Sequence, residues 1–256
     1  MSVLERILKD VRQDVRRREK ARPIDDMDVK RFKKRSMIKA IKRTPKVPVI
    51  AEIKRASPSA GNLKPDADIV KTADAMIKGG AISLSVLTEQ KHFLGDPNFL
   101  LTLRKNVGVP LLRKDFIISE YQVYEAADLG ADAVLLIARV LDEELERYMR
   151  LAKELGMESL VEVFDAEEME LASSIGANFI GINNRNLDSL EVDLHQTGRL
   201  APLVPDTATL VSESGIKSPA DVRMVLDAGA DAVLVGTAIM RAKDIEMAVK
   251  SLVEAS

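Results

Sequence analysis

The chain has 256 residues, of which 46% are hydrophobic and 30% are charged, and its net charge at pH 7 is −2. This composition excludes intrinsic disorder, and no apolar run reaches the roughly 18 residues of a membrane span. The absence of cysteine excludes disulfides, thiolate nucleophiles and cysteine-based zinc sites. Only His92 and His195 could supply imidazole, so we expect a compact cytoplasmic domain without a metal site or Ser-His-Asp triad.

The first segment, residues 1–46, is strongly basic. It holds 17 Lys and Arg against 7 Asp and Glu, whereas the remaining 210 residues hold 21 against 33. Apolar residues recur in it at helical spacing, namely Leu4, Ile7, Leu8, Val11 and Val15. We expect an amphipathic helix that packs on the domain, with a role beside an anionic substrate as the alternative. Sparse aromatic residues disfavour nucleic-acid binding.

From residue 47 onward the chain repeats one pattern, a glycine followed by a short turn and an apolar run. Clear copies stand at 79–87, 129–137, 175–183 and 228–236, and weaker ones follow Gly108 and Gly156. Glycine supplies the backbone conformation at which a helix ends, so each copy predicts a helix end followed by a buried strand. Apolar runs at 47–54 and 209–213 bring the predicted strands to eight.

Amphipathic stretches at 66–78, 142–155, 166–175 and 219–228 separate the strands. Eight alternating units predict the α/β class and a single (β/α)8 TIM barrel over residues 47–256, preceded by the helical extension 1–46. No GxGxxG motif follows the first strand, which disfavours a dinucleotide-binding fold.

Isolated charges close several of the apolar runs: Glu52, Lys54, Lys114, Glu162 and Glu213. A charge that faces a packed interior is unfavourable unless it is paired or used. Strand ends of a barrel meet at one mouth, so these charges predict one polar site. Glu52 and Lys54 lie two residues apart on a strand and therefore point the same way, which favours their pairing.

The segments after the last two predicted strands are rich in small residues. Ser214 and Gly215 follow the first of them, and Gly236 and Thr237 follow the second. Exposed backbone N–H groups at these two positions form the usual phosphate site of this fold. The alternative is that both segments are only tight turns.

Five motifs in chain order resemble the indole-3-glycerol phosphate synthase family: VIAEIKRASPS at 49–59, LRKDF at 112–116, LVEV at 160–163, GINNRNL at 181–187 and ESGI at 213–216. The likeness spans the whole chain, including the N-terminal extension. It implies conversion of 1-(2-carboxyphenylamino)-1-deoxyribulose 5-phosphate into indole-3-glycerol phosphate, carbon dioxide and water in tryptophan biosynthesis. This lyase chemistry needs general acids, a base and a phosphate anchor, with no cofactor or metal.

The resemblance also assigns roles to the charged residues. Lys114 is similar to the general acid that protonates the substrate ketone, and Glu162 to the general base of the dehydration. Lys54 is similar to the lysine that holds the substrate carboxylate and is a second candidate acid, oriented by Glu52. Glu213 and Asn183 resemble residues that contact the substrate hydroxyls and position the acids.

Three further sets follow from the resemblance. Arg185 is expected to orient the substrate carboxylate or the neighbouring glutamates. The pocket for the anthranilate ring is expected at Phe93, Phe116, Leu135 and Leu187. The phosphate set is Ser57, Ser214, Gly215, Gly236 and Thr237, where Thr237 departs from the serine or glutamate frequent in the family. Each apolar residue could equally belong to the core, and His92 fits a solvated loop better than a lid.

Two alternatives stay open. A Schiff-base phosphosugar aldolase would use Lys54 or Lys114 as a nucleophile, and a non-catalytic barrel would only bind a phosphorylated metabolite. Phosphoribosylanthranilate isomerase is disfavoured, because that family relies on a cysteine. The expected partner is a small anionic phosphosugar and neither nucleic acid nor a membrane. We expect a monomer, with a weak dimer as the alternative.

Overall fold

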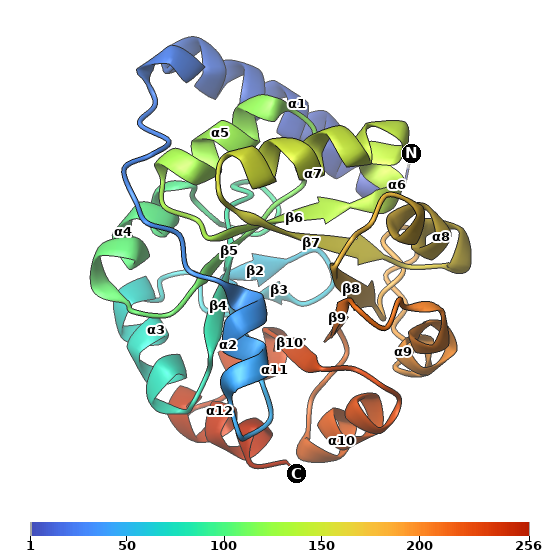
Figure 1. The fold of residues 1–256 in the computed structure, drawn as a ribbon. Coiled ribbons are helices and arrows are strands. Elements are labelled where there is room, and N and C mark those ends of the chain that lie inside the picture. Colours follow the sequence, from blue (N-terminus) through green and yellow to red (C-terminus); the bar gives the residue numbers. More distant parts are fainter. Residues whose placement is uncertain (1, 256) are drawn as a thin grey trace.

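The computed structural model describes residues 2–255, and its centre is a closed barrel of eight parallel strands (Figure 1). The predicted barrel is therefore confirmed. In chain order its strands are β1 (Val49–Ile53), β4 (Ser83–Leu87), β5 (Leu111–Lys114), β6 (Ala133–Ile137), β7 (Glu158–Val163), β8 (Phe179–Asn183), β9 (Thr209–Glu213) and β10 (Ala232–Val235). Pairing of β1 with both β4 and β10 closes the ring.

Helices surround the barrel and alternate with its strands. They are α3 (Ile69–Lys78), α4 (Asn98–Asn106), α5 (Glu120–Asp128), α6 (Ala138–Leu141), α7 (Leu145–Glu154), α8 (Ala166–Ser174), α9 (His195–Leu200), α10 (Pro219–Asp227), α11 (Thr237–Arg241) and α12 (Ile245–Val253). Single 3-10 turns lie at Asp142–Glu144 and Ala201–Leu203. A two-stranded hairpin of β2 (Ala56–Ser57) and β3 (Gly61–Asn62) follows β1, and no pattern in the sequence predicted it.

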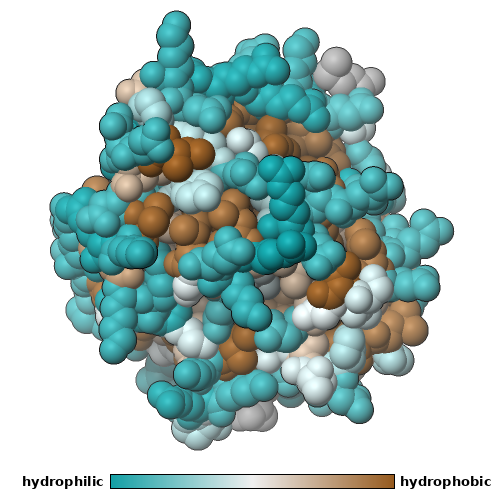
Figure 2. All heavy atoms as spheres, turned by 45° about the horizontal axis from the view of Figure 1, so that its top comes forward, coloured by the Kyte–Doolittle hydropathy of each residue, from teal (hydrophilic) through white to brown (hydrophobic). Residues whose placement is uncertain are grey.

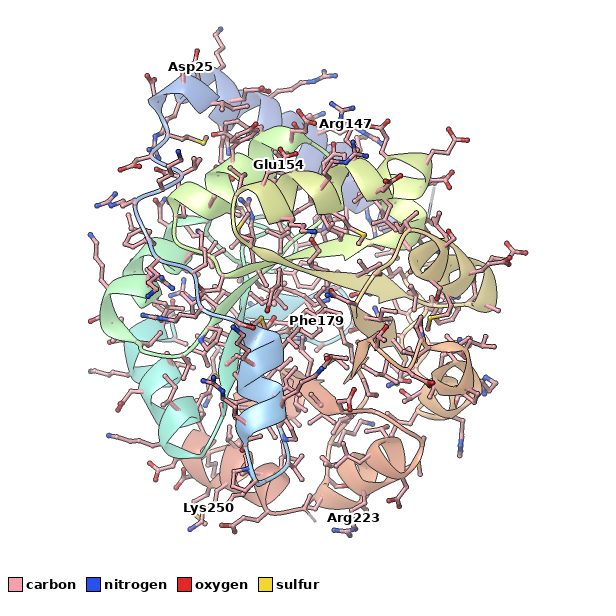
Figure 3. All side chains as sticks on the ribbon, in the orientation of Figure 1. Asp25, Arg147, Glu154, Phe179, Arg223 and Lys250 are labelled. Atoms are coloured by element: carbon pink, nitrogen blue, oxygen red, sulfur yellow. The ribbon has the colours of Figure 1, made fainter. Side chains whose placement is uncertain are left out.

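Alternation along each strand divides the core into two layers. On β7, Val161 and Val163 pack toward the outer helices, whereas Leu160 belongs to the cluster inside the barrel. Phe179, labelled near the centre of Figure 3, also belongs to the inner cluster and is fully buried. Because side chains two residues apart share a face, the residue two places after each inner apolar side chain points to the mouth of the barrel.

The N-terminal extension contacts both ends of the barrel. Helix α1 (Val3–Ala21) lies beside α5 (Figure 1), and Leu4, Ile7, Val11 and Val15 are its buried residues, as their spacing predicts. A 3-10 turn (Ile24–Asp26) follows, and α2 (Met37–Arg43) covers the end of the barrel where the strands begin. There the Glu158 carboxylate accepts hydrogen bonds from the backbone N–H of Met37 at 2.7 Å and from Ser36 Oγ.

Basic residues of the extension pair with acidic residues of the barrel. Arg18 Nε lies 2.9 Å from Glu125 Oε1, and Arg22 Nη1 lies 2.6 Å from Asp128 Oδ2. Lys34 Nζ donates to the carbonyl oxygens of Ala127 and Ala131, each at 2.9 Å. Part of the basic excess of residues 1–46 is therefore neutralised within the protein.

The face drawn in Figure 2 is mostly polar. Figure 2 shows hydrophilic side chains over most of one face, with hydrophobic ones exposed between them in smaller patches. Within residues 2–255, no helix is both long and apolar enough to cross a membrane.

Candidate active site

A pocket of about 560 Å³ opens at the carboxyl ends of the barrel strands. Every site residue expected from the sequence lines it: Glu52, Lys54, Ser57, Phe93, Lys114, Phe116, Leu135, Glu162, Asn183, Arg185, Leu187, Glu213, Ser214, Gly215, Gly236 and Thr237. The structure thus brings together residues from all parts of the barrel sequence.

Lys114 is the centre of the charged cluster. Its Nζ lies 2.7 Å from Glu162 Oε2 and 3.0 Å from Glu213 Oε2, and its side chain is 15% exposed. Burial by itself would lower the pKa of Lys114, but attraction by Glu162, Glu213 and Glu52 outweighs burial and raises it. Lys114 is therefore a protonated ammonium at neutral pH, able to donate a proton.

Glu162 is held in place from two sides. Asn183 Nδ2 donates to Glu162 Oε1 at 2.9 Å, while Lys114 pairs with Oε2. Asn183 is itself oriented, because its Oδ1 accepts the backbone N–H of Arg185 at 3.0 Å. Both carboxylate oxygens of Glu162 thus have fixed partners, which orients the carboxylate toward the pocket.

Glu213 is the most deeply buried carboxylate of the cluster, with 1% of its surface exposed. Burial raises its pKa to about 7, against the lowering effect of Lys114 and with additional repulsion from Glu162. Within residues 2–255 its Oε1 has no hydrogen-bond partner. This carboxyl group can therefore exchange a proton near neutral pH, and its Oε1 is a buried acceptor without a donor among the residues described.

The expected pairing on β1 is present. Lys54 Nζ lies 2.6 Å from Glu52 Oε1, and both side chains are largely buried. Across the pocket, Arg185 Nη1 donates to the carbonyl oxygen of Leu190 at 2.7 Å. Burial lowers the pKa of Arg185, with Glu52 acting in the opposite direction. Arg185 is thereby held at the edge of the pocket.

One wall of the pocket is apolar and includes residues that were not expected. Phe93 and Phe116 face each other with ring centroids 6.0 Å apart. Val3, Leu4 and Ile7 of α1 lie in the same lining. Their helical spacing indicated burial, but spacing does not show which surface covers a helix.

The lining after β9 and β10 has the small residues predicted for an anion site. Ser214 and Gly215 both have positive φ, 67° and 86°, which turns the chain sharply after Glu213. Lys217 and Arg241 also line the pocket, and both are exposed. Neither has an ion-pair partner in the described part of the chain. The Ser57 side chain already has a hydrogen-bond partner, because its Oγ accepts the backbone N–H of Ala60 at 3.1 Å.

A buried ion-pair network behind β5 was missed by the sequence analysis. The Arg113 side chain is fully buried on the outer face of β5, 2.9 Å from Asp115 Oδ2 and 2.7 Å from Glu125 Oε2. Asp115 Oδ1 in turn accepts the N–H of Phe116 at 2.8 Å. This network shapes the turn that follows Lys114, although Arg113 itself does not line the pocket.

Nowhere between residues 2 and 255 do three or more His, Cys, Asp or Glu side chains form a group that could hold a metal ion.

Comparison with known proteins connects this pocket to a family. A family model described as indole-3-glycerol phosphate synthase matches residues 4–252. The protein of that name from Thermoanaerobacter pseudethanolicus is 40% identical over 244 residues, 94% of each chain. The one from Acetivibrio thermocellus is 46% identical over 207 residues, 80% of each chain.

Solved structures support the fold. Tryptophan synthase subunit alpha from Legionella pneumophila superposes with a TM-score of 0.64 at 18% identity, over 86% of this chain and 97% of that one. At this identity the likeness concerns the barrel architecture alone.

Proposed function

The chain belongs to the indole-3-glycerol phosphate synthase family, and we propose that Lys114 and Glu162 are the acid and the base of its reaction. The enzyme is a lyase of tryptophan biosynthesis that converts 1-(2-carboxyphenylamino)-1-deoxyribulose 5-phosphate into indole-3-glycerol phosphate, carbon dioxide and water. One observation carries the proposal: a buried ammonium lies between two carboxylates, 2.7 Å and 3.0 Å away, in a pocket large enough for the substrate.

Ring closure is the first step. The aromatic carbon that bears the carboxylate attacks the ketone carbon, and Lys114 gives its proton to the ketone oxygen as the new C–C bond forms. The neighbouring carboxylates favour the charged lysine before this step, and they favour its return to the charged form by uptake of a proton afterwards. Carbon dioxide then leaves, and the electrons of the broken C–C bond restore the aromatic ring.

Dehydration is the second step. Glu162, fixed by Asn183, removes a proton while the hydroxyl formed from the ketone departs as water. Lys54, oriented by Glu52, holds the substrate carboxylate in the first step and is a second proton donor in this one. Glu213 lines the pocket beside Lys114, where we expect it to contact a substrate hydroxyl.

The phosphate group binds between the turns after β9 and β10. The deeper charges of the pocket give no net attraction for an anion, because Glu52, Glu162 and Glu213 are equal in number to Lys54, Lys114 and Arg185, while Asp115 is paired with Arg113 behind β5. Lys217 and Arg241 add positive charge at the rim. We therefore place the phosphate near Ser214, Gly215, Gly236 and Thr237, with Lys217 and Arg241 attracting it.

The same electrostatics disfavour the aldolase alternative. A Schiff-base lysine must be neutral to attack a carbonyl carbon, and aldolase-type lysines reach this state through a lowered pKa. Three carboxylates raise the pKa of Lys114 instead. Such a lysine suits proton donation.

Location and assembly are part of the proposal. We propose a monomer, and light scattering of the purified protein tests it. A cytoplasmic location is supported by the biosynthetic family. Ion pairs such as Arg18–Glu125 account for part of the basic charge that would otherwise suggest nucleic acid.

The test of the catalytic assignment is the growth of indole fluorescence after the substrate is added. Lys114→Ala and Glu162→Gln should each lose turnover by about two orders of magnitude or more, as expected for acid and base groups. Retained turnover in both variants would leave the family intact and refute the roles. Absence of product from the parent chain would refute the function itself.

A further inference from the structure

One face of α1 contacts two parts of the barrel, the apolar wall of the pocket and the loop between β4 and α4. Val3, Ile7, Asp10 and Asp14 follow one another at spacings of three and four, so they lie along the same stripe of the helix. Val3 and Ile7 line the apolar wall of the pocket. Asp10, one turn further along, lies over the loop between β4 and α4.

Asp10 joins α1 to that loop through two contacts. Its Oδ2 lies 2.8 Å from His92 Nε2, and its Oδ1 lies 2.8 Å from Lys91 Nζ. Asp10 and His92 are each 17% exposed, whereas Lys91 is 66% exposed. Hydrogen bonds from Lys91 and His92 lower the pKa of Asp10. The sequence suggested a solvated His92, but this side chain is mostly covered.

The loop that receives Asp10 is itself tightly held. The Glu89 carboxylate accepts the backbone N–H groups of Lys91, His92 and Phe93 at 3.0, 2.7 and 3.0 Å. Gly95 closes the loop, and a side chain there would overlap the carbonyl oxygens of Leu87 and Glu89. A contact that holds His92 in place therefore also holds the rest of this rigid loop.

The residue after His92 is Phe93, which lines the pocket opposite Phe116. The Asp10–His92 pair consequently connects two walls of the same apolar region, α1 on one side and Phe93 on the other. Within residues 2–255, the other ion pair between α1 and this loop joins Asp10 to Lys91, and it is less buried because Lys91 is mostly exposed.

We propose that Asp10 and His92 are positioning residues that hold α1 against Phe93 and so complete the binding wall for the aromatic ring of the substrate. This inference rests on the proposed function, because it takes the apolar region as the ring site. Neither residue touches the reacting atoms in this view. They act through Val3, Ile7 and Phe93, whose placement depends on the pair.

The test separates binding from chemistry. Asp10→Asn and His92→Ala should each raise KM about three- to tenfold and leave kcat within about twofold, because the wall contacts the ring in the ground state and the transition state alike. Asp10→Glu, which keeps the carboxylate, should recover most of the affinity. Adding Asp10→Asn to His92→Ala should change KM little further, since the two residues share one contact.

Two controls make the result specific. Glu19→Gln makes the same carboxylate-to-amide change at an exposed position of α1 and should leave KM unchanged. Inorganic phosphate, which probes the other end of the pocket, should inhibit the parent and Asp10→Asn with the same inhibition constant.

Three outcomes would overturn the proposal: an unchanged KM in both variants, an equal rise in KM in Glu19→Gln, or a fall in kcat alone. A parent chain without turnover would instead refute the proposed function. The two failures are therefore distinguishable.

Discussion

Gly181 on β8 lies directly against Glu213 on β9, and a Cβ at position 181 would overlap the Oε1 atom of that glutamate. The backbone of Gly181 does not need glycine, because its φ is not in the left-handed region. The missing side chain is what matters. Gly236 has the same relationship to Glu52, so two glycines make room for two carboxylates of the site.

Gly181→Ala should lower kcat by about 10²-fold or more, because Glu213 must move away from Lys114 and from the substrate. Steady-state turnover measured by indole fluorescence checks it. Gly198→Ala is the matched control, since a Cβ there would meet only Ala228 at an ordinary 3.6 Å. Equal activity of the Gly181→Ala variant and the parent would show that Glu213 does not need its present position.

Glu213→Gln should abolish most activity and yet stabilise the fold in a pH-dependent way. The pKa of Glu213 is raised from 4.5 to about 7, so the folded chain holds this proton more tightly than the unfolded chain. As pH rises from 4.5 to about 7, ionisation of Glu213 becomes unfavourable for the folded state and lowers the free energy of unfolding of the parent.

Relative to the parent, Glu213→Gln should have little effect on Tm near pH 4.5 and raise Tm by about 2–6 °C above pH 7. Differential scanning calorimetry at both pH values decides the matter. A gain that is the same at both would contradict the assigned titration.

Lys217 and Arg241 should govern substrate capture. Replacing both with Met should lower kcat/KM about tenfold at low salt, with kcat nearly unchanged, because exposed charges act on the approach of an anion. Kinetics from about 20 mM to 300 mM salt provide the measurement, and the parent should lose more of its kcat/KM over this range than the variant. Parallel salt profiles would refute the role. Lys250→Met, at an exposed position on α12, controls for net charge.

Glu158→Gln should affect stability and spare catalysis. The carboxylate accepts hydrogen bonds from Ser36 Oγ and the N–H of Met37 at the start of α2, and such a charged acceptor contributes about 1–2 kcal/mol. We expect a Tm lower by about 2–6 °C and a kcat within about twofold of the parent. A large fall in kcat without a fall in Tm would show that α2 acts on the site.

Much of this site could be predicted because the barrel imposes simple rules. Glycine-terminated helices marked the strands, and a lone charge two residues after an inner apolar side chain had to face the mouth. Glu162 after Leu160 illustrates the rule. The placement of such a side chain depends only on the direction of its strand and on the alternation of side chains between the two faces, and local sequence determines both.

Other features could not be predicted, because they depend on contacts between distant segments. The role of Gly181 follows from the side-chain conformation of Glu213 on another strand. Arg113 is next to Lys114 in sequence, yet it points outward to Asp115 and Glu125. The partner of His92 lies 82 residues away on α1, and neither periodicity nor composition relates such positions.

The extension can reach its final place only after segments far along the chain have been made. Arg18 must find Glu125, which is 107 residues further along, and Ser36 must find Glu158 after 122 residues. Until then the apolar stripe of α1 has nothing to cover it. Docking of α1 therefore waits for the middle of the chain, and the contacts that complete the apolar wall of the pocket are among the long-range contacts that form slowly.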